Sequence, residues 1–413
     1  MNFADLGLAP ALINALNEQG LSSPTLIQQQ VIPAVLQGRD VMGQAQTGSG
    51  KTLAYALPVL QRLMALAPAR EDAPRQRRTL VLVLVPTREL ATQVSEVLRD
   101  LARPLTQSIK VGTLFGGVSI NPQMMSLRSG ADVVVATPGR LLDIVAHNAL
   151  SLDAVQQLVL DEADRLLDLG FAEESQRVLA LLPAQRQNLL FSATFPPAVQ
   201  GLAEAGLRDP VRITIESTEA QAPHITQRAI AVDDKKRTAL LRQLITEHPQ
   251  QRMLVFVATR YACEHVANKL YLAGMFATAF HGEMSQGARQ TVLDEFKAGR
   301  WDVVVTTDLA SRGIDIALLP IVVNYDLPRS ATDHTHRIGR TARAGASGLA
   351  VSFVTAESQA HWGLICKREQ LDLPLEVVPG FEPTDTPPEP QGNGGVKGKR
   401  PSKKDKLRAA GLR

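Results

Sequence analysis

Eight residues near the N-terminus carry the strongest chemical signal in the chain. Residues 45–52 read AQTGSGKT and lie between a short apolar segment, 40–42, and a helical-looking run from Leu53 to Leu63. A glycine-bearing loop between a strand and a helix lets backbone N–H groups surround phosphate oxygens, and the helix N-terminus adds partial positive charge. Lys51 would reach the β- and γ-phosphates there, and the Thr52 hydroxyl would ligate Mg²⁺. The stretch therefore predicts a site for a nucleoside triphosphate.

The loop departs from the usual pattern G-x-x-x-x-G-K-[ST] at one position, where Ala45 replaces the first glycine. Taken alone, it could be a chance match or the relic of an inactive site. Such sites also need an acidic residue directly after an aliphatic strand, and Asp161 follows the run from Leu158 to Leu160. Asp161 is placed as a Mg²⁺ ligand, and Glu162 is placed to orient or deprotonate the attacking water. A plainer interpretation is a helix start favoured by its dipole, and both can hold together.

Aliphatic runs recur along the first half of the chain, and each ends in a polar or glycine-bearing signature. The predicted strands are 80–85, 111–115, 133–136, 158–160 and 189–191. Such runs are typical of strands covered on both faces, and their alternation with helical segments favours a parallel α/β sheet. Open α/β sheets bind ligands at the C-terminal ends of their strands. Residues 1–215 are therefore predicted to form one ligand-binding domain.

The second half repeats the α/β pattern with different chemistry. Periodicity lapses over residues 216–225, which we interpret as a linker, and a second domain follows over 226–372. Its predicted strands are 226–232, 253–257, 276–280, 303–306, 321–324 and 349–353. This half has no second phosphate loop, but Arg340 and Arg343 stand three residues apart. Arginines supplied from across a cleft can complete a γ-phosphate site; the alternative for any one of them is a surface salt bridge.

The amino-acid composition indicates a basic C-terminal tail and a cytoplasmic location. Residues 391–413 contain eight basic residues and one acidic residue, a charge of +7, so the other 390 carry −4 of the net +3. From residue 373 the pattern is lost and the chain becomes Pro-rich and then basic, so 373–413 are predicted to be a disordered tail. Two cysteines without metal-ligand spacing fit a reducing cytoplasm. We expect no signal peptide and no membrane partner, because no apolar run approaches the ~18 residues of a span.

Together these stretches resemble one family. The sequence is similar to the DEAD-box ATP-dependent RNA helicases, and most similar to their bacterial RhlE-like group, from Phe3 to about Phe353. The first half supplies the glutamine segment 20–28, AQTGSGKT (45–52), PTRELA (86–91), Gly116-Gly117, TPGR (137–140), DEAD (161–164) and SAT (192–194). The second supplies the strand end 256–260, His281-Gly282 with Gln286 and Arg289, TTDLASRGIDI (306–316) and HRIGRTARAG (336–345). The family tolerates Ala45, whereas Ala342 stands where it usually has Gly and His334 where it often has Tyr.

The resemblance implies two RecA-like domains in tandem that close on ATP, Mg²⁺ and single-stranded RNA together. Gln28 also has an independent argument, since a glutamine amide can pair with the N6 and N7 edge of adenine. The residues implied at the ATP site are Phe3, Gln28, Thr47, Gly48, Ser49, Gly50, Lys51, Thr52 and Asp315, with Thr52 and Asp161 on Mg²⁺. Catalysis is implied for Lys51, Asp161, Glu162, Arg340 and Arg343, and coupling of hydrolysis to strand separation for Ser192 and Thr194.

RNA contacts are implied at strand ends in both halves. They are Pro86, Thr87, Arg88, Gly117, Thr137, Gly139 and Arg140 in the first, and Arg260, Gly282, Gln286, Arg289 and Thr307 in the second. Backbone amides, hydroxyls and a few arginines suit sugar–phosphate contacts, and contact with 2′-hydroxyls would favour RNA over DNA. The predicted function is RNA-stimulated ATP hydrolysis coupled to separation of short duplexes or to remodelling of ribonucleoproteins. Ribosomal and RNA-decay assemblies are candidate partners.

Two functions of other classes would share parts of this sequence pattern. A non-enzymatic RNA-binding protein on the same fold would be expected to have lost a catalytic residue, yet Lys51, Asp161 and Glu162 are present, as are both arginines. A GTPase or small-molecule kinase would share the phosphate loop. A GTPase would need an Asn-Lys-x-Asp stretch to read guanine, and the nearest stretch, 268–271, reads NKLY.

Overall fold

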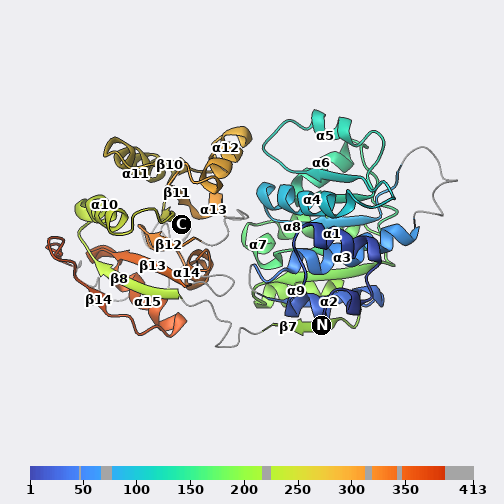
Figure 1. Ribbon diagram of the computed structural model, residues 1–413, viewed down its shortest axis with the longest axis horizontal. Helices are drawn as coiled ribbons and strands as arrows, with labels where there is room; N and C mark the ends of the chain where they lie inside the picture. Colours follow the sequence, from blue (N-terminus) through green and yellow to red (C-terminus); the bar gives the residue numbers. More distant parts are fainter. Residues whose placement is uncertain (46–47, 67–76, 216–224, 312–318, 342–346, 387–413) are drawn as a thin grey trace, which may run out of the picture.

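The chain forms two seven-stranded parallel sheets, each flanked by helices, and the two domains lie side by side (Figure 1). The structure is a computed structural model and describes residues 1–45, 48–66, 77–215, 225–311, 319–341 and 347–386. The predicted fold class, two parallel α/β domains in tandem, is confirmed. The predicted linker lies outside the described residues except for Ile225, which is the first residue of a strand.

The first sheet has the strand order β3-β4-β2-β5-β6-β1-β7, and every described pair is parallel. In chain order its strands are β1 Val41–Gln44, β2 Val81–Leu84, β3 Val111–Leu114, β4 Val133–Ala136, β5 Gln157–Leu160, β6 Gln187–Ser192 and β7 Val211–Thr214. Because all strands run the same way, their C-terminal ends share one edge of the sheet. That edge carries the predicted motifs.

The second sheet has the order β10-β11-β9-β12-β13-β8-β14 and is also parallel. Its strands are β8 Ile225–Ala231, β9 Met253–Val257, β10 Ala277–Phe280, β11 Val303–Thr307, β12 Ile321–Asn324, β13 Gly348–Val354 and β14 Leu375–Glu376. The strand order is the same in both sheets: β10, β11 and β9 correspond to β3, β4 and β2, and β12, β13, β8 and β14 correspond to β5, β6, β1 and β7. The two halves therefore share one topology.

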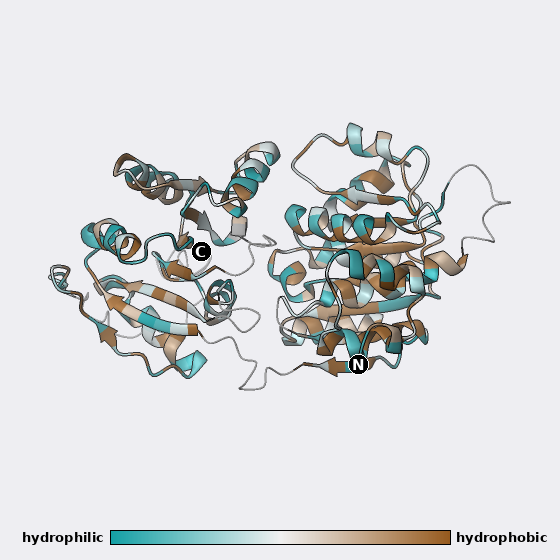
Figure 2. Cartoon of the chain, in the orientation of Figure 1, coloured by the Kyte–Doolittle hydropathy of each residue, from teal (hydrophilic) through white to brown (hydrophobic). Residues whose placement is uncertain are grey.

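Buried strands form the core of each domain. Along β2, Val81 and Val83 pack into one hydrophobic cluster, whereas Leu82 and Leu84 pack into another on the opposite face. This alternation follows from the two-residue period of a strand. It requires helices on both faces, and Figure 2 shows hydrophobic colouring along the strands with hydrophilic colouring on outward helical surfaces.

The helices connect successive strands across these faces. In the first domain they are η1 Ala4–Leu6, α1 Pro10–Glu18, α2 Leu26–Leu36, α3 Lys51–Leu66, α4 Arg88–Ala102, α5 Asn121–Ser126, α6 Pro138–Ala146, α7 Ala163–Asp168, α8 Ala172–Ala180 and α9 Pro197–Gly206. In the second they are η3 Asp234–Lys236, α10 Arg237–Glu247, α11 Arg260–Leu272, α12 Gln286–Lys297, α13 Asp308–Ser311, α14 Ala331–Ile338, η4 Ala356–Ser358 and α15 Gln359–Glu369. Within the described ranges, no helix has the length and apolar character that crossing a bilayer would require.

The prediction that the chain is disordered from residue 373 is wrong for residues 373–386. This segment adds β14 beside β8, and Glu376 accepts hydrogen bonds from the Arg228 guanidinium at 2.7 and 3.0 Å. Asp233 then accepts from the backbone N–H groups of Thr384 and Asp385 at 2.8 and 3.0 Å. Hydrogen bonds to Arg228 and Asp233, together with packing of Leu375, Val378 and Phe381 against the core, thus hold this segment in place. Residues 387–413, which include the basic stretch, lie outside the described residues.

Candidate functional site

The phosphate loop joins β1 to α3, as the sequence predicts. Gly48 and Gly50 adopt φ values of 86° and 92°, a region that favours glycine because it has no Cβ. Between them, the Ser49 hydroxyl is buried and has no hydrogen-bond partner among the described residues. An unsatisfied buried hydroxyl in a glycine loop fits a ligand with acceptor oxygens, such as a phosphate. Thr47 lies outside the described residues.

The glutamine segment is tied directly to this loop. Gln28 is buried at the third position of α2, where its Oε1 accepts from the Thr25 N–H at 2.9 Å in a capping box. Its Nε2 donates to the Gly50 carbonyl at 3.1 Å. A Cβ on Gly50 would lie 2.5 Å from that Nε2, so only glycine fits there. Phe3, the other residue implied at the adenine, is buried at 4% exposure immediately before η1, which packs against α2.

Lys51 is the first residue of α3 and is 7% exposed. Its Nζ donates to the Ala45 carbonyl at 2.5 Å, on the loop itself. Burial lowers the pKa of Lys51, and the carboxylates of Asp161, Glu162 and Asp164 oppose that shift. The ammonium thus lies in a buried site that already contains acidic groups from another strand, where its interaction with a phosphate would be strong.

Asp161 follows β5 and is held by a residue that the sequence analysis missed. The Tyr55 hydroxyl, fully buried on α3, donates to Asp161 Oδ2 at 2.8 Å and also contacts the Thr52 side chain. Burial raises the pKa of Asp161 to about 6, against the opposing effect of Lys51. The two predicted Mg²⁺ ligands, Thr52 and Asp161, are therefore brought together, and both offer the oxygen atoms that Mg²⁺ prefers. Only the three-dimensional fold places Tyr55 between them.

Glu162 has an unusual backbone conformation. Its φ of 52° and ψ of 52° place it in the left-handed region, although it is not glycine. Such a residue costs of order 1–3 kcal/mol and persists only where its surroundings hold it, which is common at functional sites. Arg165 holds it here, since Nη1 of Arg165 donates to Glu162 Oε2 at 2.8 Å and both side chains are buried. Arg165 was not predicted from the sequence.

Ser192 and Thr194 contact the acidic motif through Asp164. The Ser192 hydroxyl accepts from the Asp164 N–H at 3.2 Å and donates to the Thr194 carbonyl at 2.6 Å. Thr194 donates to Asp164 Oδ2 from both its N–H and its hydroxyl, each at 2.9 Å. A movement at the end of β6 would therefore be transmitted to the residues beside Glu162. The coupling role expected for the two hydroxyl residues stays a prediction.

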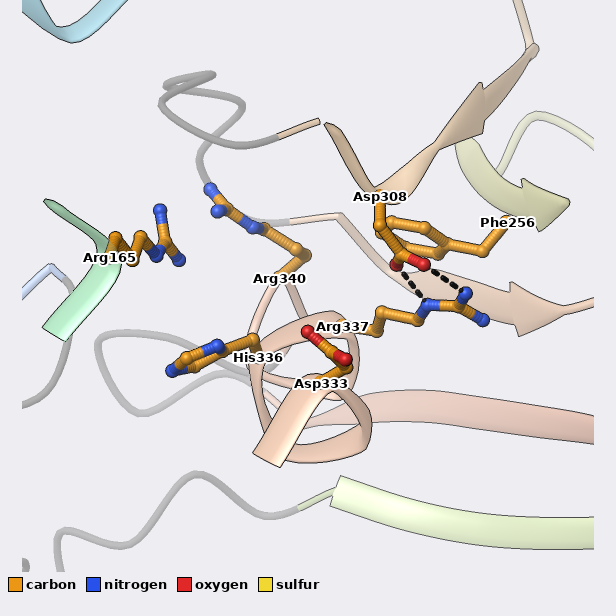
Figure 3. A pocket seen from close by; sticks show the side chains of 7 residues that line it. All are labelled: Arg165, Phe256, Asp308, Asp333, His336, Arg337 and Arg340. Carbon is orange, nitrogen blue, oxygen red and sulfur yellow. Dashed lines mark hydrogen bonds and ion pairs between the residues drawn. The ribbon is translucent and has the colours of Figure 1, made fainter. Parts of the chain in front are cut away.

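Arg340 faces the first domain across a pocket between the domains. The pocket is lined by Arg165 from α7 and by Phe256, Asp308, Asp333, His336, Arg337 and Arg340 from the second domain (Figure 3). Arg340 is 5% exposed, and its side chain and that of His336 extend toward Arg165 (Figure 3). Burial lowers the pKa of His336 to about 4, with Arg165 and Arg340 acting in the same direction. Arg343 and Asp315 lie outside the described residues.

Arg337, three residues before Arg340, has a different role. Its Nε and Nη2 donate to Asp308 at 2.5 and 2.7 Å, and its Nη1 donates to Asn324 at 3.1 Å. Its guanidinium also lies over the Phe256 ring, 4.8 Å from the centroid. Arg337 therefore fixes α14 on its own domain and aims Arg340 at the other one.

The predicted RNA residues of the first domain gather at three neighbouring strand ends. Gly117 follows β3, Thr137, Gly139 and Arg140 follow β4, and Pro86, Thr87 and Arg88 follow β2. A Cβ on Gly117 would lie 2.6 Å from Arg88 Nη1, so this glycine makes room for the arginine. Arg140 is buried and donates to the Val118 carbonyl at 2.7 Å, while its Nη1 has no hydrogen-bond partner within the described part of the chain.

The second domain places its predicted RNA residues on the equivalent strands. Gly282 and Gln286 follow β10, Thr307 ends β11 and Arg260 follows β9. These three strands are neighbours in the order in which β3, β4 and β2 occur in the first sheet. Arg260 also pairs with Glu283, next to Gly282. The structure therefore brings four of the five predicted residues to one part of the sheet edge.

Arg289, the fifth, contacts the first domain. It is 3% exposed, and its Nη2 lies 2.7 Å from Glu89 Oε1 on α4 and 3.3 Å from the Ala310 carbonyl. Its guanidinium also lies over the Phe280 ring at 4.8 Å. This buried ion pair crosses between the domains beside the proposed RNA residues. An RNA contact of Arg289 stays a proposal.

Removing either member of this pair tests what it does. Arg289→Ala and Glu89→Ala are each expected to weaken RNA binding about tenfold or more with a non-hydrolysable ATP analogue, because each leaves a buried charge uncompensated. Fluorescence anisotropy measures the affinity, and the double variant should lose less than the two single losses combined. Glu96→Ala, exposed on the same helix, is the matched control. Tighter RNA binding by Glu89→Ala would instead mean that Glu89 competes with RNA for Arg289.

Comparisons with known proteins identify the family of both domains. The family model described as DEAD/DEAH box helicase matches residues 25–202, and the helicase conserved C-terminal domain model matches residues 235–345. The chain is 42% identical over 372 residues to the ATP-dependent RNA helicase DbpA of Escherichia coli (strain K12), which covers 90% of this chain and 79% of that protein. It is 42% identical over 384 residues to the ATP-dependent RNA helicase DeaD of Mycobacterium tuberculosis, covering 93% and 66%.

A solved structure matches both domains together. Dbp5 of S. cerevisiae bound to RNA and ADP BeF3 superposes with a TM-score of 0.77 at 29% identity, over 91% of this chain and 95% of that one. The two helicase domain models together span both RecA-like domains of this chain. The chain belongs to the DEAD-box ATP-dependent RNA helicases.

Proposed function

We propose that this chain hydrolyses ATP with Mg²⁺ at the β5, β6 and β1 strand ends of its first domain while single-stranded RNA lies across β3, β4 and β2. The observation that supports this division most directly is the duplication of the sheet. The second domain carries its predicted RNA residues on β10, β11 and β9, the strands equivalent to β3, β4 and β2. Side by side, the two edges would form one track for a single strand.

The contacts of each residue at the proposed ATP site suggest its role. The glycine loop and Lys51 would bind the phosphates, and Thr52 and Asp161 would hold Mg²⁺, which neutralises charge developing on the phosphoryl oxygens. Glu162 would orient the attacking water and take its proton. Arg340 would reach the γ-phosphate from the second domain, so full activity would require both domains to close. RNA binding across both domains would favour that closure.

The test is phosphate release from ATP without nucleic acid, with single-stranded RNA and with DNA of the same sequence. We expect RNA to stimulate release strongly and DNA to stimulate it weakly, because contacts at 2′-hydroxyls favour RNA. Arg300→Ala is a suitable control for the protein preparation, since this arginine is exposed and pairs with the nearby Glu295. Equal rates under all three conditions would contradict the proposed RNA track.

The basic stretch 391–413 is proposed to add non-specific RNA affinity. Its charge of +7 would release counterions on binding, and each phosphate contact contributes about 0.7 to the salt dependence of single-strand binding. Deleting residues 391–413 is therefore expected to flatten a plot of log affinity against log salt. A scrambled tail of equal charge should restore the slope. An unchanged slope after deletion would remove this stretch from RNA binding.

The RNA substrate in the cell is proposed only as a class of RNA. A relative that is 41% identical over 355 residues is named an ATP-dependent rRNA helicase, which favours ribosomal RNA as one substrate to test. RNA-decay assemblies are the other candidate partners, and a cytoplasmic location is proposed with them. The RhlE-like subgroup likewise stays a prediction.

A further inference from the structure

An aromatic pair stands exposed where α11 begins. Tyr261 is 73% exposed, and its ring stacks on that of His265 with centroids 5.7 Å apart and planes 12° apart. Residues four apart lie on the same face of a helix, so the pair forms a small ring surface directed to solvent. Exposed aromatic rings serve many proteins as platforms for unpaired bases.

The duplicated topology places this pair at the proposed RNA edge. Thr87 after β2 and Thr259 after β9 both cap the following helix, accepting from the N–H three residues on at 3.3 and 3.1 Å. Arg88 and Arg260 follow as equivalent residues, and both were predicted to contact RNA. Tyr261 therefore occupies the position of Glu89, the residue that reaches across to the second domain. It lies beside Arg260 at the end of the track.

Nearby charges favour a base over a phosphate at this surface. The loop that carries Gly282 is held against the first turn of α11 by two contacts, Arg260 with Glu283 and His281 Nε2 with Glu264 Oε1 at 3.1 Å. Glu264 is the neighbour of Tyr261 one helical turn on. The Glu264 carboxylate would repel a phosphate from the ring surface, whereas the ring of Tyr261 would attract the face of a base.

We propose that Tyr261, supported by His265, stacks on one base of the single-stranded RNA next to the nucleotide whose phosphate meets Arg260. The inference rests on the proposed RNA track and adds a base contact to its sugar–phosphate contacts. Stacking accepts every base because each has a π-face, so the platform would hold the strand without reading its sequence. It would also keep that base from rejoining a duplex.

A double-mutant cycle tests the proposal by removing the Tyr261 ring from the protein and one base from the RNA, separately and together. Short RNAs with a single abasic position, moved along the strand, are titrated with the full chain and a non-hydrolysable ATP analogue. Tyr261→Ala is expected to weaken binding of the intact RNA about five- to a hundredfold, and one abasic position should abolish that difference. Tyr261→Phe should keep the wild-type affinity because it keeps the ring. Tyr271→Ala, 58% exposed near the other end of α11, is the matched control and should not change it.

The outcomes separate this inference from the function on which it rests. If Tyr261→Ala binds as tightly as the wild type, or weakens every abasic RNA equally, the stacking platform is refuted while the RNA track stands. If Arg260→Ala also leaves the affinity unchanged, the track itself is misplaced. Loss at one abasic position alone, with Tyr261→Phe unaffected, supports the platform.

Discussion

Replacing Glu162 by glutamine is expected to lower kcat for RNA-stimulated ATP hydrolysis by about 10²- to 10⁴-fold while the protein stays folded and binds ATP. Glutamine keeps the size of the side chain and an oxygen that can accept from Arg165, the partner found at 2.8 Å. It cannot take a proton from water. Phosphate release at saturating ATP and RNA measures the loss, and thermal unfolding checks the fold.

Two further variants make this result specific. Lys51→Ala should also stop turnover, but through loss of ATP affinity, because its ammonium would bind the phosphates directly. Glu173→Gln, exposed at the start of α8, should behave as the wild type. Near-normal turnover by Glu162→Gln would show that another group activates the water.

The central strands could be predicted because their signal is local. Runs such as Leu80 to Val85 and Val133 to Ala136 are buried on both faces, so the core demands continuous aliphatic residues there. The edge strands β7 and β14 were missed, since each has only one neighbouring strand and neither is a fully buried aliphatic run. β14 is held by its pairing with β8, by packing of Leu375 and by the ion pair between Arg228 and Glu376, residues far apart in the sequence.

The site was predictable where one motif carries one function. The phosphate loop, the acidic motif and the strand-end residues are each continuous in sequence. The resemblance to a family then assigned a role to each of them. Contacts between motifs were not predictable in that way. Tyr55 reaches Asp161 only because α3 packs beside β5, and Arg289 meets Glu89 only because the domains lie together. Such partners need the fold before they can be named.

Replacing Arg340 by alanine is expected to lower RNA-stimulated ATP hydrolysis by about 10³- to 10⁵-fold, the value typical of an arginine that stabilises charge on a transferred phosphoryl group. Arg340 is buried between the domains, while Arg337 holds the same helix in place through Asp308. The loss should therefore fall on turnover and spare the fold. Phosphate release with and without RNA measures turnover, and a direct ATP-binding measurement shows whether the variant still folds and binds ATP.

The chemistry of the guanidinium makes this prediction sharper. Arg340→Lys keeps the charge but not the planar fork of donors, so it should recover little activity. ATP affinity should change little in either variant, because the phosphate loop belongs to the first domain. The basal rate without RNA should fall less than the stimulated rate, since Arg340 acts only when the domains close. If Arg340→Ala keeps full RNA stimulation, Arg340 does not stabilise the transferred phosphoryl group. Arg343 or another residue would then supply that positive charge when the domains close.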